Sequence, residues 1–199
     1  MFKLPKMLKW VFSFALLLQL TGCGINTIPT LDEQVNADWA QVENNYQRRA
    51  DLIPNLVATV KGYASHEKDT LTAVTEARSK VSSMQVTPET LNNPEAFKKF
   101  EAAQGELSSA LSRLMVVSER YPDLKANEQF VALQAQLEGT ENRIAVARRD
   151  YINSVKAFNT EIRTFPGRIW HWIMYNDLKA KPNFSATTPN ADVAPKVAF

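Results

Sequence analysis

The stretch that decides the fold is RRADLIPNLV, residues 48–57, which lies inside a long amphipathic run. Along this run, apolar side chains recur at steps of mostly three and four residues, a spacing that places them on one stripe of an α-helix. The stripe consists of Val35, Trp39, Val42, Tyr46, Ile53, Leu56, Val60, Tyr63, Leu71, Val74 and Val81. Such a stripe has to be covered by other helices, so the run predicts a helical bundle.

The first helix is expected to span residues 31–84, with Thr30 and Glu33 forming a capping box at its start. Pro54 lies inside this helix, where it lacks an amide hydrogen and crowds the preceding turn. Two outcomes are open. The helix kinks at Pro54 and continues, or it breaks there and Asp51 caps a new helix, which would make four helices in all. The apolar stripe stays in register across Pro54, which favours the kink.

Two later segments carry matching apolar stripes. Asn93 followed by Pro94 is a helix start signal, and Pro122 stops the second helix. Asn127 caps the third helix, which ends at residues 165–167. The predicted fold is therefore all-α: an elongated antiparallel up-down bundle of three long helices, the first kinked or broken near Pro54, plus a short C-terminal helix.

The N-terminus resembles an export signal. Three lysines precede an apolar run of 11 residues, 10–20, which is too short to span a bilayer comfortably. Residues 20–23, Leu-Thr-Gly-Cys, resemble the bacterial lipobox, in which the cysteine is lipidated and becomes the new N-terminus. Cys23 is the only cysteine of the chain. The alternative is an ordinary signal anchor with Cys23 as a bystander. Gly24, rather than Asp, favours the outer membrane facing the periplasm if the source is Gram-negative.

The expected divisions of the chain follow from these signals. They are a lipoprotein signal peptide (1–22), a tether (23–29), the helical bundle (30–166), an aromatic amphipathic segment (167–178) and a disordered tail (179–199).

Charge and motifs argue against several function classes. Without residues 1–22 the chain keeps 20 basic and 21 acidic side chains, which gives no electrostatic footprint for nucleic acid. His66 and Glu67 superficially resemble a zinc-protease helix, but Thr70 stands where the second histidine would be. No phosphate-cradling glycine motif or nucleophile motif occurs. We therefore expect no enzymatic activity, no cofactor and no metal.

Several motifs resemble the LemA family of bacterial envelope proteins, over about residues 35–167. They are Trp39, Arg48-Arg49, residues 51–57 (DLIPNLV), 60–64 (VKGYA), 66–68 (HEK), 121–127 (YPDLKAN), 140–142 (TEN), 144–145 (IA), 147–149 (ARR), Tyr151, Val155, 158–159 (FN), Ile162 and 165–167 (FPG). The resemblance implies an elongated helical bundle behind an N-terminal membrane anchor, with a poorly defined biochemical activity. Ile152 and residues 175–178 depart from the family pattern, and the lipobox resembles a variant anchor.

Polar residues of these motifs are the candidate site. They are Arg48, Arg49, Asp51, Asn55, Glu141, Asn142, Arg148 and Arg149. In an antiparallel bundle such residues commonly form interhelical ion pairs that set register, and the functional alternative is a docking surface. Trp170, Trp172 and Tyr175 either cap the open end of the bundle or contact a membrane, since Trp and Tyr favour the bilayer interface.

The sequence thus predicts a membrane-anchored envelope lipoprotein, held in the membrane by lipidated Cys23 and acting as a non-enzymatic scaffold for unidentified envelope proteins. The alternative is a lipid- or envelope-polymer-binding module that uses the basic and aromatic surfaces. Self-association is left open by the sequence.

Overall fold

The structure, a computed structural model, describes residues 24–84 and 88–185. Within these ranges it consists of helices and loops, without a strand, which confirms the predicted all-α class. The elements are α2 (Thr27–Tyr63), α3 (Lys68–Ser82), the 3-10 helix η1 (Pro88–Asn92), α4 (Pro94–Ser118), α5 (Pro122–Lys125), α6 (Glu128–Glu161) and α7 (Gly167–Met174).

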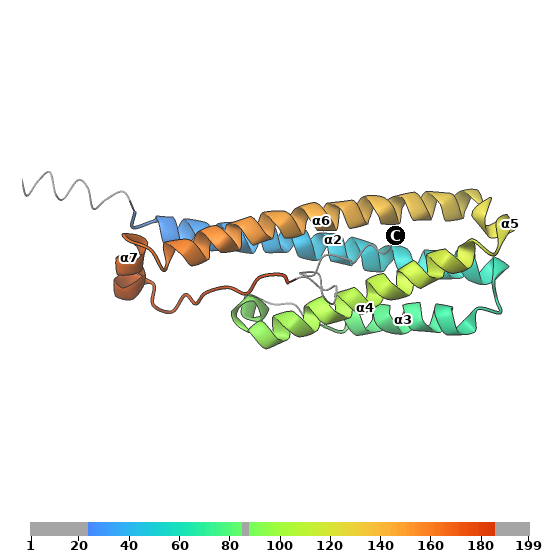
Figure 1. Ribbon diagram of the computed structural model, residues 1–199, viewed down its shortest axis with the longest axis horizontal. Helices are drawn as coiled ribbons and strands as arrows, with labels where there is room; N and C mark the ends of the chain where they lie inside the picture. The colour runs from blue at the N-terminus through green and yellow to red at the C-terminus, as the bar shows by residue number, and fades with distance from the viewer. Residues whose placement is uncertain (1–23, 85–87, 186–199) are drawn as a thin grey trace, which may run out of the picture.

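The helices form a rod (Figure 1). α2 and α6 run side by side along most of its length, and the shorter helices α3 and α4 form a second pair beneath them. Successive long helices run in opposite directions, so the chain makes an up-down bundle of four helices. α7 lies at the end of the rod where α2 begins.

The expected single helix over residues 31–84 is wrong, because the chain reverses between α2 and α3. α2 continues through Pro54 and ends at Tyr63, and α3 begins at Lys68. At the reversal, Ala64 leaves the helical conformation while its N–H still bonds to the Val60 carbonyl at 2.8 Å. The apolar stripe is interrupted between Tyr63 and Leu71. That interruption, rather than the proline, marked the turn.

Two of the three predicted helix caps are confirmed. Asn93 Oδ1 accepts the N–H of Glu95 at 3.0 Å and that of Ala96 at 3.2 Å, and Asn127 Oδ1 accepts the N–H of Phe130 at 2.9 Å.

The third predicted cap, at Thr30, is wrong. α2 already begins at Thr27, and the Thr30 hydroxyl donates to the Asn26 carbonyl at 2.8 Å. The earlier start brings Ile28 into the core, fully buried. The predicted tether, residues 23–29, is therefore partly helical, and residue 23 lies outside the described residues.

The core consists of two apolar clusters that follow each other along the rod. One contains Ile53, Leu56, Leu107, Leu114 and Phe130. The other contains Ile28, Trp39, Phe97, Tyr151 and Phe158, among others. Along α2, the buried Arg49 lies between Tyr46 of one cluster and Ile53 of the other. A charged side chain therefore occupies the point where the two apolar clusters meet.

Residues 179–185 were expected to be disordered, and the structure corrects this. They continue from α7 as an extended segment that packs against the bundle; we call residues 179–185 the strap. Asn159 of α6 holds the backbone of Lys181 through two hydrogen bonds of 2.9 Å, and the Lys181 side chain is 5% exposed. Phe184 packs on the rings of Trp39, Phe97 and Tyr151. The strap is ordered because it covers apolar surface of the bundle. Residues 186–199 of the predicted tail lie outside the described residues.

Candidate functional site

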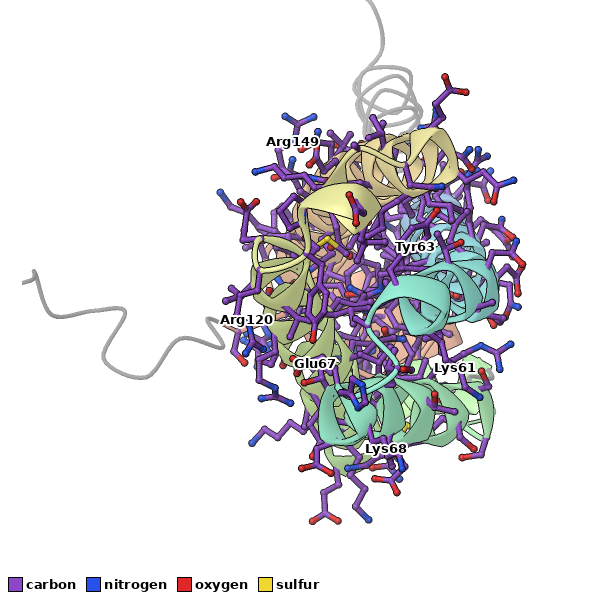
Figure 2. All side chains as sticks on the ribbon, turned by 90° about the vertical axis from the view of Figure 1, so that its right-hand side faces the viewer. Lys61, Tyr63, Glu67, Lys68, Arg120 and Arg149 are labelled. Carbon is purple, nitrogen blue, oxygen red and sulfur yellow. The ribbon has the colours of Figure 1, made fainter. Side chains whose placement is uncertain are left out.

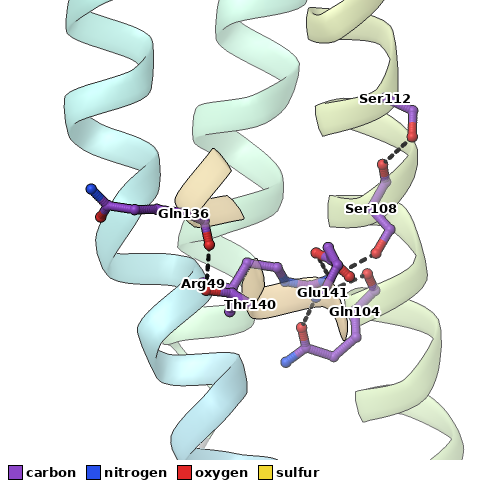
Figure 3. A network of polar contacts seen from close by, with 7 residues as sticks. All are labelled: Arg49, Gln104, Ser108, Ser112, Gln136, Thr140 and Glu141. Carbon is purple, nitrogen blue, oxygen red and sulfur yellow. Dashed lines mark hydrogen bonds and ion pairs between the residues drawn. The ribbon is translucent and has the colours of Figure 1, made fainter. Parts of the chain in front are cut away.

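Arg49 occupies the centre of the bundle and joins three helices (Figure 3). Its side chain is 1% exposed. Nη1 donates to Ser108 Oγ of α4 at 2.8 Å and to Glu141 Oε1 of α6 at 2.9 Å, while Nη2 donates to the Gln104 side chain and to its carbonyl at 3.4 Å. The planar guanidinium presents its donors in a fixed fork, so it binds all three partners at once only when the helices are in one register.

The surroundings of Arg49 explain how a buried charge is tolerated. Its guanidinium lies 5.0 Å from the centre of the Tyr46 ring, a cation–π contact. Glu141 is 41% exposed, so the pair is only partly removed from water. Arg49 Nε is buried and has no hydrogen-bond partner among the described residues. Burial raises the pKa of Tyr46, which stays neutral beside this network.

A second polar contact lies further along the same helices. Arg148 Nη2 of α6 is 3.5 Å from Glu101 Oε1 of α4, and the Glu101 side chain is 8% exposed. Glu101 also accepts the backbone N–H and the hydroxyl of Ser185, both at 3.0 Å. The Arg148 guanidinium lies 4.2 Å from the centre of the Phe184 ring. This contact therefore connects α4 and α6 with the strap.

The remaining polar candidates lie toward solvent. Arg48, Asp51 and Asn55 of α2, and Asn142 and Arg149 of α6, are exposed. Asp51 accepts a hydrogen bond from Gln47 at 2.9 Å, and Arg149 lies 3.4 Å from its neighbour Asp150. The structure thus separates the predicted set into three residues that hold helices together, Arg49, Glu141 and Arg148, and five that do not.

An open groove runs between α2 and α6 on the solvent side. Its volume is about 420 Å³, and it is lined by Asp38, Gln41, Asn45, Asn142, Arg143, Val146, Ala147 and Asp150. Of the predicted residues only Asn142 lines it, and Arg149 lies beside it in the sequence. Carboxylates and a guanidinium both line the groove, so its walls carry charges of both signs.

The aromatic candidates lie on and just after α7. Trp170 and Tyr175 are half-buried and pack against the core, whereas Trp172 is 76% exposed. α7 approaches the end of α6 closely at Gly167, where a Cβ atom would collide with the Glu161 carbonyl oxygen. The start of the described chain lies beside this helix: a Cβ atom built on Gly24 would be 3.5 Å from Trp170 Nε1.

Sequence reasoning missed the partners that α4 and the strap supply. Gln104 was a detectable signal, because it stands four residues after Phe100 and three before Leu107, on the apolar stripe of α4. Lys181 offered no local signal. Its Nζ donates to Asn92 Oδ1 at 3.1 Å and lies 3.1 Å from Asp32 Oδ1, in an ion pair without hydrogen-bond alignment.

The described part of the chain offers neither a cluster of metal-binding side chains nor a membrane-spanning helix. Residues 24–84 and 88–185 hold no group of three or more His, Cys, Asp or Glu side chains that could bind a metal ion. In the same ranges, no helix combines the length and the apolar character needed to cross a bilayer.

The fold and the arginine-centred contacts define an elongated all-α bundle whose helices are locked in register by buried polar side chains. The chain belongs to the LemA family: the family model with that description matches residues 38–199. The match reaches beyond residue 167, where the recognised motifs end, and so includes α7 and the strap. A comparison with the curated proteins finds none that matches.

Proposed function

We propose that the protein is a lipid-anchored, non-enzymatic scaffold of the bacterial cell envelope that presents a polar helical face to protein partners. The observation that carries this proposal is the division of the motif residues into two groups. Arg49 and Arg148 make contacts that join helices, whereas Asn142 lies toward solvent in the groove between α2 and α6, and Arg149 is exposed on α6 next to the groove residue Asp150 in the sequence.

The groove suits a protein partner better than a uniformly charged polymer. Asp38, Asp150 and Arg143 place both signs of charge along it, and amide side chains such as Asn45 and Asn142 offer donors and acceptors. Mixed charges favour a complementary protein surface and its register, because a polyanion would be repelled by the carboxylates. A rigid rod keeps these groups at fixed spacing, which lowers the entropy lost when a partner binds.

The anchor is proposed at Cys23. The lipobox-like residues 20–23 support it, and α2 begins at Thr27, so a lipidated Cys23 would hold the rod by one end. Several acyl chains, at about 0.8 kcal/mol for each buried methylene, make such an anchor durable. In a Gram-negative source, Gly24 favours the outer membrane with the rod in the periplasm.

Site-specific photo-crosslinking in intact cells tests the docking face. A photoreactive residue at position 142 is expected to give discrete protein adducts, and the same residue at position 116, exposed on α4, is the control. Arg143→Glu is expected to remove the adducts at position 142. Adducts with lipid or glycan, or equal protein adducts at both positions, would contradict the proposal.

Arg148 and Arg149 offer a matched pair for the same question. Arg149→Gln should leave the free energy of unfolding unchanged and reduce capture at position 142, because its side chain is exposed. Arg148→Gln should lower the free energy of unfolding, because it leaves the buried Glu101 carboxylate with Ser185 alone. If the Arg149→Gln protein is folded and still gives the same crosslinked adducts at position 142, Arg149 is not part of the docking face.

The anchor has its own test. Cys23→Ser is expected to leave an unprocessed precursor that takes up no fatty-acid probe. Normal maturation of this variant, with continued labelling, would refute the lipoprotein assignment. The crosslinking result does not depend on this outcome.

A further inference from the structure

α7 carries apolar side chains on both of its faces, and only one face is used by the bundle. Gly167 is buried and Trp170 is half-buried against the core. On the other side, Ile169 is 45% exposed, Trp172 76% and Ile173 56%. These three positions follow the i, i+3, i+4 spacing of one helix face. Packing against the bundle therefore does not account for the outward-facing residues.

Further apolar side chains enlarge this exposed surface. Phe165 is 82% exposed and Met174 52%. We call Ile169, Trp172 and Ile173 the α7 outer face; Phe165 precedes α7, and Met174 is its last residue. Of the large apolar side chains exposed elsewhere in the described chain, three are valines, at positions 116, 131 and 146, and the fourth is Tyr63. Single exposed residues need no explanation, but three large apolar side chains on one face of a short helix indicate a contact surface.

The two ends of the rod differ in chemistry. α7 lies at one end, beside Gly24. Figure 2 shows the opposite end, where charged side chains such as Lys61, Glu67 and Arg120 surround the turns. There Arg120 Nη2 lies 3.0 Å from Glu67 Oε1. The apolar group thus lies at the end where the described chain begins, one residue after Cys23.

The charges around the α7 outer face favour an anionic surface. From residue 161 to residue 180 the chain contains the exposed basic residues Arg163, Arg168 and Lys179 against two acidic residues, the half-buried Glu161 beside Gly167 and the exposed Asp177. Trp and apolar residues with basic neighbours are the composition that settles at the boundary between lipid headgroups and acyl chains.

We propose that the α7 outer face inserts into the headgroup region of an anionic phospholipid bilayer and thereby sets the rod upright on the membrane. This inference rests on the proposed tether at Cys23. A contact of so few side chains binds weakly by itself, but a tether that ends beside Trp170 gives it a high effective concentration at the bilayer. We assign the α7 outer face to lipid and not to a protein partner, because it combines a tryptophan, aliphatic side chains and basic neighbours at the end of the rod that the tether would hold.

Quenching of tryptophan fluorescence by brominated lipids tests this contact. The full chain, purified from membranes, is reconstituted into anionic vesicles whose lipids carry bromine at a shallow or a deep acyl position. The Trp172 signal is the difference between the wild type and Trp172→Phe. It is expected to be quenched, and more strongly by the shallow position. Trp39→Phe is the matched control, because Trp39 is 4% exposed in the core and its signal should not respond.

The possible results separate this contact from the lipid anchor. Quenching of Trp172 in a protein that incorporates no fatty-acid probe supports the α7 contact and refutes lipidation of Cys23. A labelled protein whose Trp172 signal is unquenched overturns the α7 contact and leaves the anchor standing. A photoreactive residue at position 172 that crosslinks two copies of the chain, together with an unquenched Trp172 signal, would also overturn the lipid contact. In that case a second copy of the chain would cover α7. Equal quenching in neutral and anionic vesicles overturns the assignment to anionic lipid.

Discussion

Arg78 of α3 donates its Nε hydrogen to the backbone carbonyl of Ala50 in α2, at 2.9 Å. Ala50 is four residues before Pro54, so its carbonyl is the one that Pro54, which has no N–H, leaves without its helical partner. Ala50 is 2% exposed, which keeps water from replacing the lost bond. The proline therefore does not break α2. It supplies an acceptor for the helix that folds back onto it.

A double-mutant cycle tests this relationship. Arg78→Leu in the wild type is expected to lower the free energy of unfolding by about 1–3 kcal/mol, because a buried carbonyl loses its donor. In a Pro54→Ala background the same change should cost less, since the alanine restores the missing N–H within the helix. Urea unfolding of the four proteins gives the coupling energy. Equal costs in the two backgrounds would mean that Arg78 does not act through this carbonyl.

Arg49 and Arg48 are neighbours in the sequence with opposite environments. Arg49→Met is expected to lower the free energy of unfolding by about 3 kcal/mol, because Gln104 and Glu141 lose a buried partner and Glu141 can recover only part of its hydration. Arg48→Met, at an exposed position, should change it by less than about 0.5 kcal/mol. Chemical denaturation measures both. If the two variants lower the free energy of unfolding by similar amounts, Arg49 does not hold the helices together.

The strap depends on Phe184. Phe184→Ala should lower the free energy of unfolding by about 2 kcal/mol, less than the roughly 3–5 kcal/mol of fully buried aromatic side chains, because Phe184 is half-buried. Hydrogen exchange gives the direct readout. The amides of Lys181 and Ser185 are bonded to Asn159 and Glu101, and they should lose protection together. Lys179→Ala, at an exposed position, is the control, and unchanged protection in Phe184→Ala would show that other contacts order the strap.

Buried tyrosines make stability depend on alkaline pH. Burial raises the pKa of Tyr151 and of Tyr46 above 10.0, so the folded state holds these phenolic protons more tightly than the unfolded state does. The resulting stabilisation is fully present below about pH 10 and is lost as the pH rises further. Denaturation at about pH 9 and about pH 11 should show this fall, and Tyr151→Phe should reduce it.

Tyr151→Phe has a second effect that serves as its internal check. The Tyr151 hydroxyl donates to the Pro182 carbonyl at 3.0 Å, so its removal should lower stability at neutral pH by about 1 kcal/mol. A variant with the same alkaline fall as the wild type would show that Tyr151 does not contribute to it.

The caps and the stripes show how much could be predicted locally. Asn93 and Asn127 start helices as expected, because an N-cap acts on amides two or three residues away. Pro54 misled the prediction, because the response of a helix to proline depends on which group binds the freed carbonyl. That donor, Arg78, is 28 residues away from Ala50 in the sequence.

For the candidate site too, the sequence identified the residues, but only the tertiary structure showed which of them enter the bundle. The motifs identified Arg48, Arg49, Arg148 and Arg149 together, but adjacent residues on a helix point in directions about 100° apart. Which arginine of each pair enters the bundle therefore depends on where α4 lies. The strap lay beyond prediction, because Lys181 and Phe184 are held by side chains of distant helices.

The sequence by itself determined the all-α class, two helix caps and most of the residues of the apolar stripes, because periodicity and capping are interactions within one or two helical turns. Only the tertiary structure decided that the first run folds back as two helices, that Arg49 and Arg148 are used inside the bundle, and that residues 179–185 are ordered. These outcomes depend on pairing between segments far apart in the chain, and the free energy of such pairing is absent from any local pattern.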